Sequence, residues 1–141
     1  MDYETVSARD FGHSLHGISV NLLVRDVPAE AAFLMAVFGM QAHRITADFA
    51  IVLHAGQPFQ LHSDHSFLTN PLHSLLPEAG PRGAGIEVRL HEADPDLAVA
   101  AAAAFDDAVV LQNPTDKAGH GLREAVILCP NGYAWVPSRR I

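Results

Sequence analysis

The two halves of this 141-residue chain repeat one pattern, and this repeat constrains the fold more than any other feature. Residues 20–28 read as a strand followed by an Asp and a Pro that open a helix, and residues 86–95 read the same way. In each half the last strand-like run follows a glycine, which is Gly56 in the first half and Gly132 in the second. Because an internal repeat marks a fold built from equivalent units, the sequence predicts two copies of one βαβββ module.

Turn residues and hydrophobic periodicity divide the chain into four segments. These are a polar lead-in at 1–16, a first module at 17–63, a linker at 64–82 and a second module at 83–141. We expect the lead-in to be loosely held, because chain ends without periodic apolar residues are seldom packed. The predicted helices begin after Asp26 and Asp94 and run to about Phe38 and Phe105.

Each module is expected to supply four strands around its helix. Period-two alternation and turn signals place them at Ile18–Arg25, Gln41–Thr46, Phe49–His54 and Pro58–Ser63, then at Gly83–His91, Ala108–Gln112, Leu122–Leu128 and Tyr133–Pro137. Residues 113–121 are polar and rich in glycine, so they are predicted to form a loop.

Composition and charge exclude several classes of protein. An apolar fraction of 49% with 18% charged residues is typical of a folded globular chain. The net charge of −7, with no basic run, argues against nucleic acid or an anionic membrane as partner, and no apolar run reaches the length of a spanning helix. The single Cys129 excludes an intrachain disulfide and the acidic N-terminus does not resemble a signal peptide, so we expect a cytoplasmic protein.

The tail of the chain carries a family resemblance. Residues 121–133 read GLREAVILCPNGY, which is similar to the G-x-R-x…D-P-x-G ending of the vicinal oxygen chelate superfamily, with Cys129 in the place of the usual Asp. That superfamily includes glyoxalase I, bleomycin-resistance proteins, fosfomycin-resistance enzymes and type I extradiol dioxygenases. The resemblance covers about residues 17–137. It implies an α+β fold in which two βαβββ modules form a curved mixed sheet that encloses a ligand cup.

The resemblance also indicates where a metal would bind, and the residues there are poor ligands. Metal-using relatives take their ligands from the first and last strands of each module. The repeat places these slots at Ser19, Gln60, Gly85 and Val136. Glycine and valine offer no side-chain donor, serine is a poor one, and a single glutamine does not make a metal site. We therefore expect no metal and no other cofactor.

A displaced histidine site is the alternative. His62, Asp64 and His65 lie at the end of a predicted strand, with His54 on the strand before. A His-x-Asp-His run can bind a transition metal, which would make the chain a glyoxalase- or dioxygenase-like lyase, isomerase or oxygenase. Because the segment runs into a loop, we favour ordinary polar residues at a strand end.

The remaining candidates are predicted to bind a ligand without metal. Alternation places Asn21, Gln60, His62, Glu87 and Arg89 on the faces of the strands that carry the slots. Glu87 can pair with an arginine, contact a cationic or hydroxylated ligand, or act as a general base.

Three further candidates follow from the tail. Arg123 can clamp a carboxylate, or pair with Glu87, Asp116 or Glu124. Tyr133 and Trp135 can pack against a planar ligand, although core packing explains such rings equally well. Both Glu87 and Arg123 are expected to line or border the cup.

These observations predict a small-molecule-binding protein of the glyoxalase/bleomycin-resistance type, without the family metal. Its partner would be a small organic ligand, as for the bleomycin-resistance proteins it resembles. We also expect a homodimer, because members of this fold commonly pair and the apolar fraction leaves surface to cover. Cys129 lies at a predicted turn without a recognisable histidine partner, so it is interpreted as a replaced turn residue and not as a nucleophile.

Overall fold

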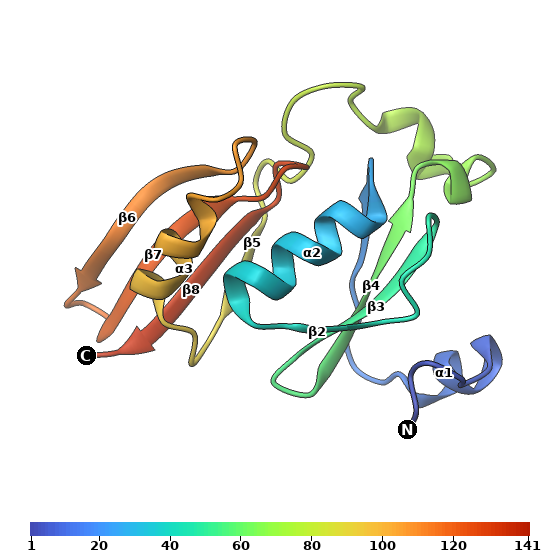
Figure 1. Cartoon of the computed structure of the whole chain (residues 1–141), viewed down its shortest axis with the longest axis horizontal. Coiled ribbons are helices and arrows are strands. Elements are labelled where there is room, and N and C mark those ends of the chain that lie inside the picture. Colours follow the sequence, from blue (N-terminus) through green and yellow to red (C-terminus); the bar gives the residue numbers. More distant parts are fainter. The chain divides into compact units, whose positions relative to one another are not determined.

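The repeat predicted from the sequence is present in the computed structural model, which describes residues 1–141 (Figure 1). Each repeat forms an open four-stranded mixed sheet, so the predicted α+β class with two βαβββ modules is confirmed. The chain divides into two compact units, one of Met1–Ala31 with Met40–Ser74 and one of Ala32–Gly39 with Leu75–Ile141. No helix in the chain is both long and apolar enough to cross a membrane.

The first sheet has the strand order β1-β4-β3-β2. Its strands are β1 (Asn21–Val24), β2 (Gln41–His43), β3 (Phe49–His54) and β4 (Gln57–Ser63). β1 runs parallel to β4, whereas the other neighbours are antiparallel. A parallel pair needs a crossover connection, which begins with α2 (Val27–Phe38). The Asp26 carboxylate accepts a hydrogen bond from the Ala29 amide at 3.0 Å, and Gly39 ends the helix with φ +67°.

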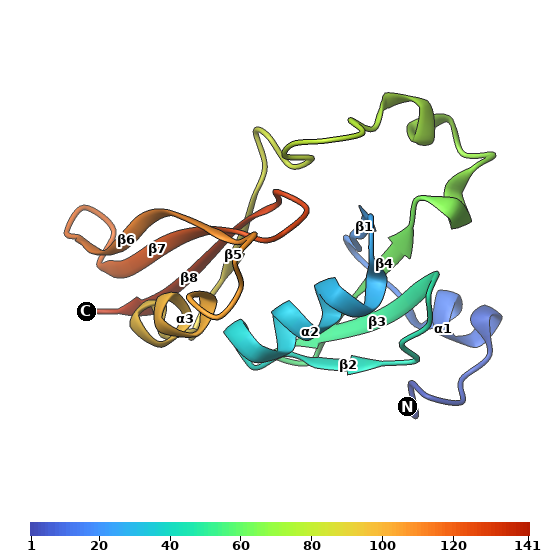
Figure 2. The same ribbon diagram turned by 45° about the horizontal axis from the view of Figure 1, so that its top comes forward.

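The second sheet repeats this order as β5-β8-β7-β6. Its strands are β5 (Glu87–Leu90), β6 (Val109–Lys117), β7 (Leu122–Leu128) and β8 (Ala134–Arg140), and β5 is parallel to β8. α3 (Pro95–Ala102) contacts β6, β7 and β8 and so covers one face of this sheet (Figure 2). The predicted cap is confirmed, because Asp94 accepts from the amides of Asp96 at 2.8 Å and Leu97 at 3.4 Å.

The strand boundaries differ from the predicted ones at several points. β1 and β5 begin later than expected, and in β5 the cause is Gly85, whose φ of +86° interrupts an extended chain. β2 ends three residues early, where Arg44 takes φ +52°, and β8 continues to Arg140. β6 is longer than expected and continues to Lys117 through the predicted 113–121 loop. Two register shifts accommodate Pro114 and the polar residues around it, so β6 pairs with β7 along most of its length.

The linker carries two 3₁₀ turns and no strand, as its turn residues predicted. They are η1 (His65–Phe67) and η2 (Pro71–Leu75). Its far end packs on the β7–β8 turn, where the Arg82 amide donates to the Asn131 carbonyl at 3.0 Å, and the next residue, Gly83, donates from its amide to the Gly132 carbonyl at 3.2 Å. A Cβ on Gly83 would lie 2.6 Å from a ring carbon of Tyr133, so this approach requires glycine.

The lead-in is ordered, which corrects the expectation that it would be loosely held. It forms α1 (Ala8–Ser14), whose Phe11 side chain is only 4% exposed. The Glu4 carboxylate accepts from Nδ1 of His43 at 3.1 Å and from the Arg44 amide at 3.1 Å. We refer to residues 1–16 as the N-terminal arm. Its partners lie far along the chain, so local periodicity carried no sign of this packing.

The burial of Phe11 predicts how the arm is held. Replacing Phe11 with Ala should release the arm, because losing a buried phenylalanine ring costs about 3–5 kcal/mol and the exposed contacts of Glu4 are worth about 1 kcal/mol. Limited proteolysis should then cut within residues 1–16 faster, while amide exchange in β3 and β4 stays slow. His13→Ala, on an exposed position of the same helix, is the control. Equal cleavage rates for both variants would contradict this account.

Candidate functional site

One face of the first sheet gathers polar residues from two neighbouring strands. The register places Asn21 of β1 beside Gln60 of β4, and Leu23 beside His62. Because side chains alternate along a strand, Asn21, Gln60 and His62 share one face, as the sequence predicted. Nε2 of His62 lies 3.3 Å from Oε1 of Gln60, so the imidazole and the amide form a hydrogen-bonded pair.

Two phenylalanine rings that were not among the predicted site residues flank His62. The imidazole centroid lies 5.2 Å from that of Phe49, on β3, and 4.8 Å from that of Phe67, in η1. Burial lowers the pKa of His62 below its ordinary value, so the ring is neutral near pH 7. A neutral imidazole has one donor and one acceptor nitrogen, which suits binding to an uncharged polar group.

The N-terminal arm covers the β2 end of the same face. His43, Ile51 and Gln60 lie in one row across β2, β3 and β4. The Tyr3 ring of the arm stands 5.6 Å from the His43 ring, and Ile51 is fully buried. The polar face is therefore bounded by the arm at this end.

A charged cluster occupies one face of the second sheet. Arg89 Nη1 donates to Glu87 Oε2 at 3.1 Å, and Nη2 donates to Glu124 Oε2. Nε2 of His120 lies 3.3 Å from the same Glu124 oxygen. Burial acts to raise the pKa of Glu124, but its bonds to Arg89 and His120 hold that pKa below the ordinary value. Glu87 thus pairs with an arginine, Arg89, which is one of the roles expected for it. Glu124 and His120 were not among the predicted site residues.

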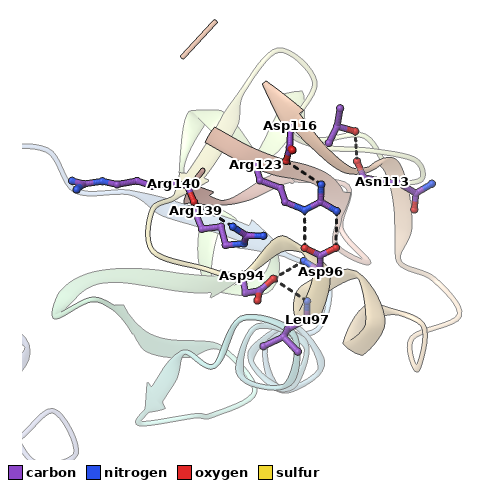
Figure 3. A network of polar contacts seen from close by, with 9 residues as sticks. Asp94, Asp96, Leu97, Asn113, Asp116, Arg123, Arg139 and Arg140 are labelled. Carbon is purple, nitrogen blue, oxygen red and sulfur yellow. Dashed lines mark hydrogen bonds and ion pairs between the residues drawn. The ribbon is translucent and has the colours of Figure 1, made fainter. Parts of the chain in front are cut away.

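Arg123 lies on the opposite face of this sheet, which corrects its predicted place at the cup. Its Nε and Nη2 donate to the two carboxylate oxygens of Asp96, in α3, at 2.8 and 2.9 Å (Figure 3). Its Nη1 donates to Asp116 on β6 at 3.1 Å. Successive strand residues point to opposite faces, so Arg123 faces α3 and Glu124 faces away from it. These ion pairs raise the pKa of Arg123 and lower that of Asp96.

The two aromatic candidates do not lie with the charged cluster. Trp135 is fully buried, with its ring centroid 5.8 Å from that of Phe38, so it packs in the core of the second unit. Tyr133 is 9% exposed and lies against the backbone at Gly83. Both rings therefore have packing roles in this structure. Cys129 takes part in the β7–β8 turn, accepting from the Gly132 amide at 2.8 Å, as expected of a replaced turn residue.

The registers of the two sheets also correct one of the four metal slots. Asn21 pairs with Gln60 and Arg89 pairs with Val136, so Asn21 and Arg89 are equivalent. Two residues before each stand Ser19 and Glu87, and the equivalent of Ser19 is therefore Glu87 and not Gly85. The error came from counting back from the end of the strand. In this register the helix caps Asp26 and Asp94 are equivalent, but β1 ends two residues before its cap and β5 ends four residues before, with Glu92 at φ +59° in between.

The corrected slots still do not suit a divalent metal. The four positions are now Ser19, Gln60, Glu87 and Val136, and Val136 is fully buried. They offer one hydroxyl, one amide and one carboxylate, whereas Zn²⁺ or Fe²⁺ needs several imidazole, thiolate or carboxylate donors. Nor do three or more His, Cys, Asp or Glu side chains come together elsewhere in a way that could hold a metal ion. In this structure His62, Asp64 and His65 are not brought together as a ligand set, because the chain turns into η1 after Asp64 and His62 packs against Phe67.

Solved structures show which known proteins share this architecture. A glyoxalase/bleomycin resistance protein/dioxygenase family enzyme from Burkholderia phytofirmans superposes with a TM-score of 0.71 at 19% identity, covering 87% of this chain and 97% of its own. The chain has the glyoxalase/bleomycin-resistance/dioxygenase fold. This finding confirms, at the level of the fold, the resemblance to the vicinal oxygen chelate superfamily.

Two further structures agree. A glyoxalase-related enzyme from Fulvimarina pelagi has a TM-score of 0.68 at 12% identity, covering 89% of this chain and 88% of its own. A glyoxalase/bleomycin resistance protein/dioxygenase from Nocardioides has a TM-score of 0.63 at 16% identity, covering 94% and 91%. No model of a protein family matches the sequence, and no curated protein matches it. At these identities the shared property is the fold.

The environment of His62 predicts its titration. Its pKa should lie below the ordinary value of 6.5 in NMR titrations of the folded protein, and Phe67→Ala should raise it by admitting water. Between the folded and ordinary pKa values the unfolded chain binds more protons, so this group makes the free energy of unfolding rise with pH there. Leu68→Ala, at an exposed neighbour of Phe67, is the control. A His62 pKa at or above the ordinary value would refute this description.

Proposed function

We propose that this chain is a small-molecule-binding protein that holds an organic ligand on a polar face of one of its sheets, without a family metal. One observation carries the proposal. The residues at and around the former ligand slots are organised as hydrogen-bonding groups, with Gln60 joined to His62 and Glu87 joined to Arg89. Such groups, on strands of a rigid sheet, suit the orientation of a ligand better than the coordination of a metal.

The chemistry of these groups indicates the kind of ligand. Glu87 keeps a carboxylate that is 55% exposed although it is paired with Arg89, so it can receive a cationic or hydroxylated group. Asn21 and Gln60 supply amide donors and acceptors, and Phe49 and Phe67 supply apolar contact beside His62. The net charge of −7 is also compatible with a cationic organic ligand. These features support the bleomycin-resistance-like reading over a metal enzyme.

A ligand screen followed by variants tests this function. Small organic molecules that raise the thermal midpoint of the protein should lose about 10–100-fold in affinity with Gln60→Ala if they bind the first sheet, or with Glu87→Gln if they bind the second, because a bond to a charged or buried polar group is worth roughly 1.5–3 kcal/mol. Arg123→Gln should lower stability and leave the affinity unchanged, since Arg123 lies on the α3 face. Equal affinity loss in all three variants would count against binding at these faces.

Elemental analysis of the purified protein separates this proposal from the metal-dependent alternative. We expect no stoichiometric Zn, Ni, Mn or Fe, and no change with His62→Ala. About one metal ion per chain that disappears in His62→Ala would establish a displaced metal site instead and would overturn the proposal.

We further propose that the chain works as a symmetric homodimer in the cytoplasm. Ile18 and Ile86, just before the edge strands β1 and β5, are 95% and 61% exposed, which leaves apolar surface for a second copy to cover. Sedimentation at micromolar concentration should show a dimer, and Ile18→Asp should shift it toward monomer. Leu97→Asp, at a 70% exposed position of α3, should leave the dimer intact. A wild-type monomer would contradict this prediction.

A further inference from the structure

His120 and Glu124 form an imidazole–carboxylate pair that the ligand-binding residues proposed above do not include. Nε2 of His120 lies 3.3 Å from Glu124 Oε2. The Glu124 side chain is 9% exposed and the His120 side chain is 52% exposed. A buried carboxylate thus holds one end of an imidazole whose other end is accessible. The side chains of Glu124 and Arg89 lie on the same face of the second sheet, opposite the face that α3 covers.

The protonation states in this pair follow from its partners. The pKa of Glu124 is lowered, so the carboxylate is ionised near neutral pH and can only accept hydrogen bonds. In neutral His120 the proton must therefore lie on Nε2, the nitrogen that faces Glu124. Nδ1 then carries a free lone pair. An imidazole held in one tautomer by a carboxylate has the arrangement of a general base.

Arg89 places a cationic donor at the same oxygen. Both Arg89 Nη2 and His120 Nε2 approach Glu124 Oε2, so the guanidinium and the imidazole meet at one atom. Arg89 donates from Nη1 to Glu87 and from Nη2 to Glu124. Arg89 thus keeps Glu124 in the ionised form that positions the imidazole.

The turn that carries His120 leaves its ring open. Gly119 and Gly121 stand on either side, and neither presents a side chain that could shield the imidazole. Gly121 takes φ +69°, and its amide donates to the Lys117 carbonyl at 2.9 Å, which fixes the turn. A fixed backbone with an open side chain suits a residue that meets a ligand.

We propose that His120 is a general base that takes the proton from an acidic hydroxyl of a bound ligand, with Glu124 positioning the imidazole and Arg89 holding Glu124 ionised. This inference rests on the proposed function, because it assigns a ligand class, phenols or enols, to the polar face of the second sheet. In the step, the ligand O–H bond breaks, its proton forms a bond with Nδ1, and the electron pair stays on the oxygen. The imidazolium is then paired with the Glu124 carboxylate through Nε2 and with the ligand oxyanion through Nδ1, so charge is balanced locally.

Other charged groups on this face also affect how the proposed proton transfer depends on pH. Glu87 comes from β5, and Arg140 from β8 belongs to the same face as Glu124 because it pairs with Leu122. Lys117, at the start of the turn, donates to Gln112 at 3.3 Å. The His120 ring contacts Glu124, so this carboxylate is the charged group that directly touches the proposed base.

The probe for the test is 4-nitrophenol, whose anion absorbs visible light and whose neutral form does not. Bound to the intact protein, the probe should ionise at a pH lower than in water by roughly one unit, a tenfold shift in its equilibrium. His120→Ala, at an exposed turn position that should not affect folding, should abolish the shift while NMR still detects binding. Added free imidazole should restore part of it. His91→Ala, which removes an exposed histidine after β5, should behave as wild type.

The remaining outcomes separate this proposal from the binding function. Glu124→Gln should move the ionisation midpoint of the bound probe to higher pH, because the imidazolium loses its carboxylate partner. If 4-nitrophenol binds without any shift, or the shift survives in His120→Ala, the general base is refuted while binding at the face stands. If 4-nitrophenol does not bind but another organic molecule does, the ligand class is refuted. If no organic molecule binds at all, the proposed function fails as well.

Discussion

The parallel pairing of the first and last strands in each module is the constraint on which the rest of the structure depends. β1 with β4, and β5 with β8, close each βαβββ unit, and their register fixes which side chains share a face. A shift of one residue would turn Gln60 and Glu87 away from their present neighbours. The same register shows that Ser19 and Glu87 are equivalent, which the spacing within one strand could not reveal.

Alternation across a strand then separates two charged networks that are adjacent in sequence. Arg123 joins Asp96 and Asp116 and ties β7 to α3 and β6. Glu124, the next residue, joins Arg89 and His120 on the other face. The first network contributes to the packing of α3, whereas the second leaves donors and acceptors exposed. One strand thus supports both the helix layer and the face on which we propose that a ligand binds.

The two polar faces differ in chemistry although the modules are equivalent in fold. In the first unit, neutral groups dominate: an amide hydrogen-bonds to His62, and two phenylalanine rings flank the imidazole. The second unit carries two carboxylates, an arginine and a histidine. The fold supplies equivalent positions, and the residues at those positions decide what each half can recognise.

The sequence by itself determined the two modules, the caps at Asp26 and Asp94 and the faces of Asn21, Gln60 and His62, because repeats, capping and alternation are local signals. Only the tertiary structure decided that Arg123 faces α3, that Trp135 packs on Phe38 and that Glu124 meets Arg89. It also decided that the N-terminal arm packs on β2. These contacts join residues far apart in the chain, and their geometry depends on register, on bulges in β6 and on the early end of β5 before α3. None of these leaves a periodic trace in the sequence.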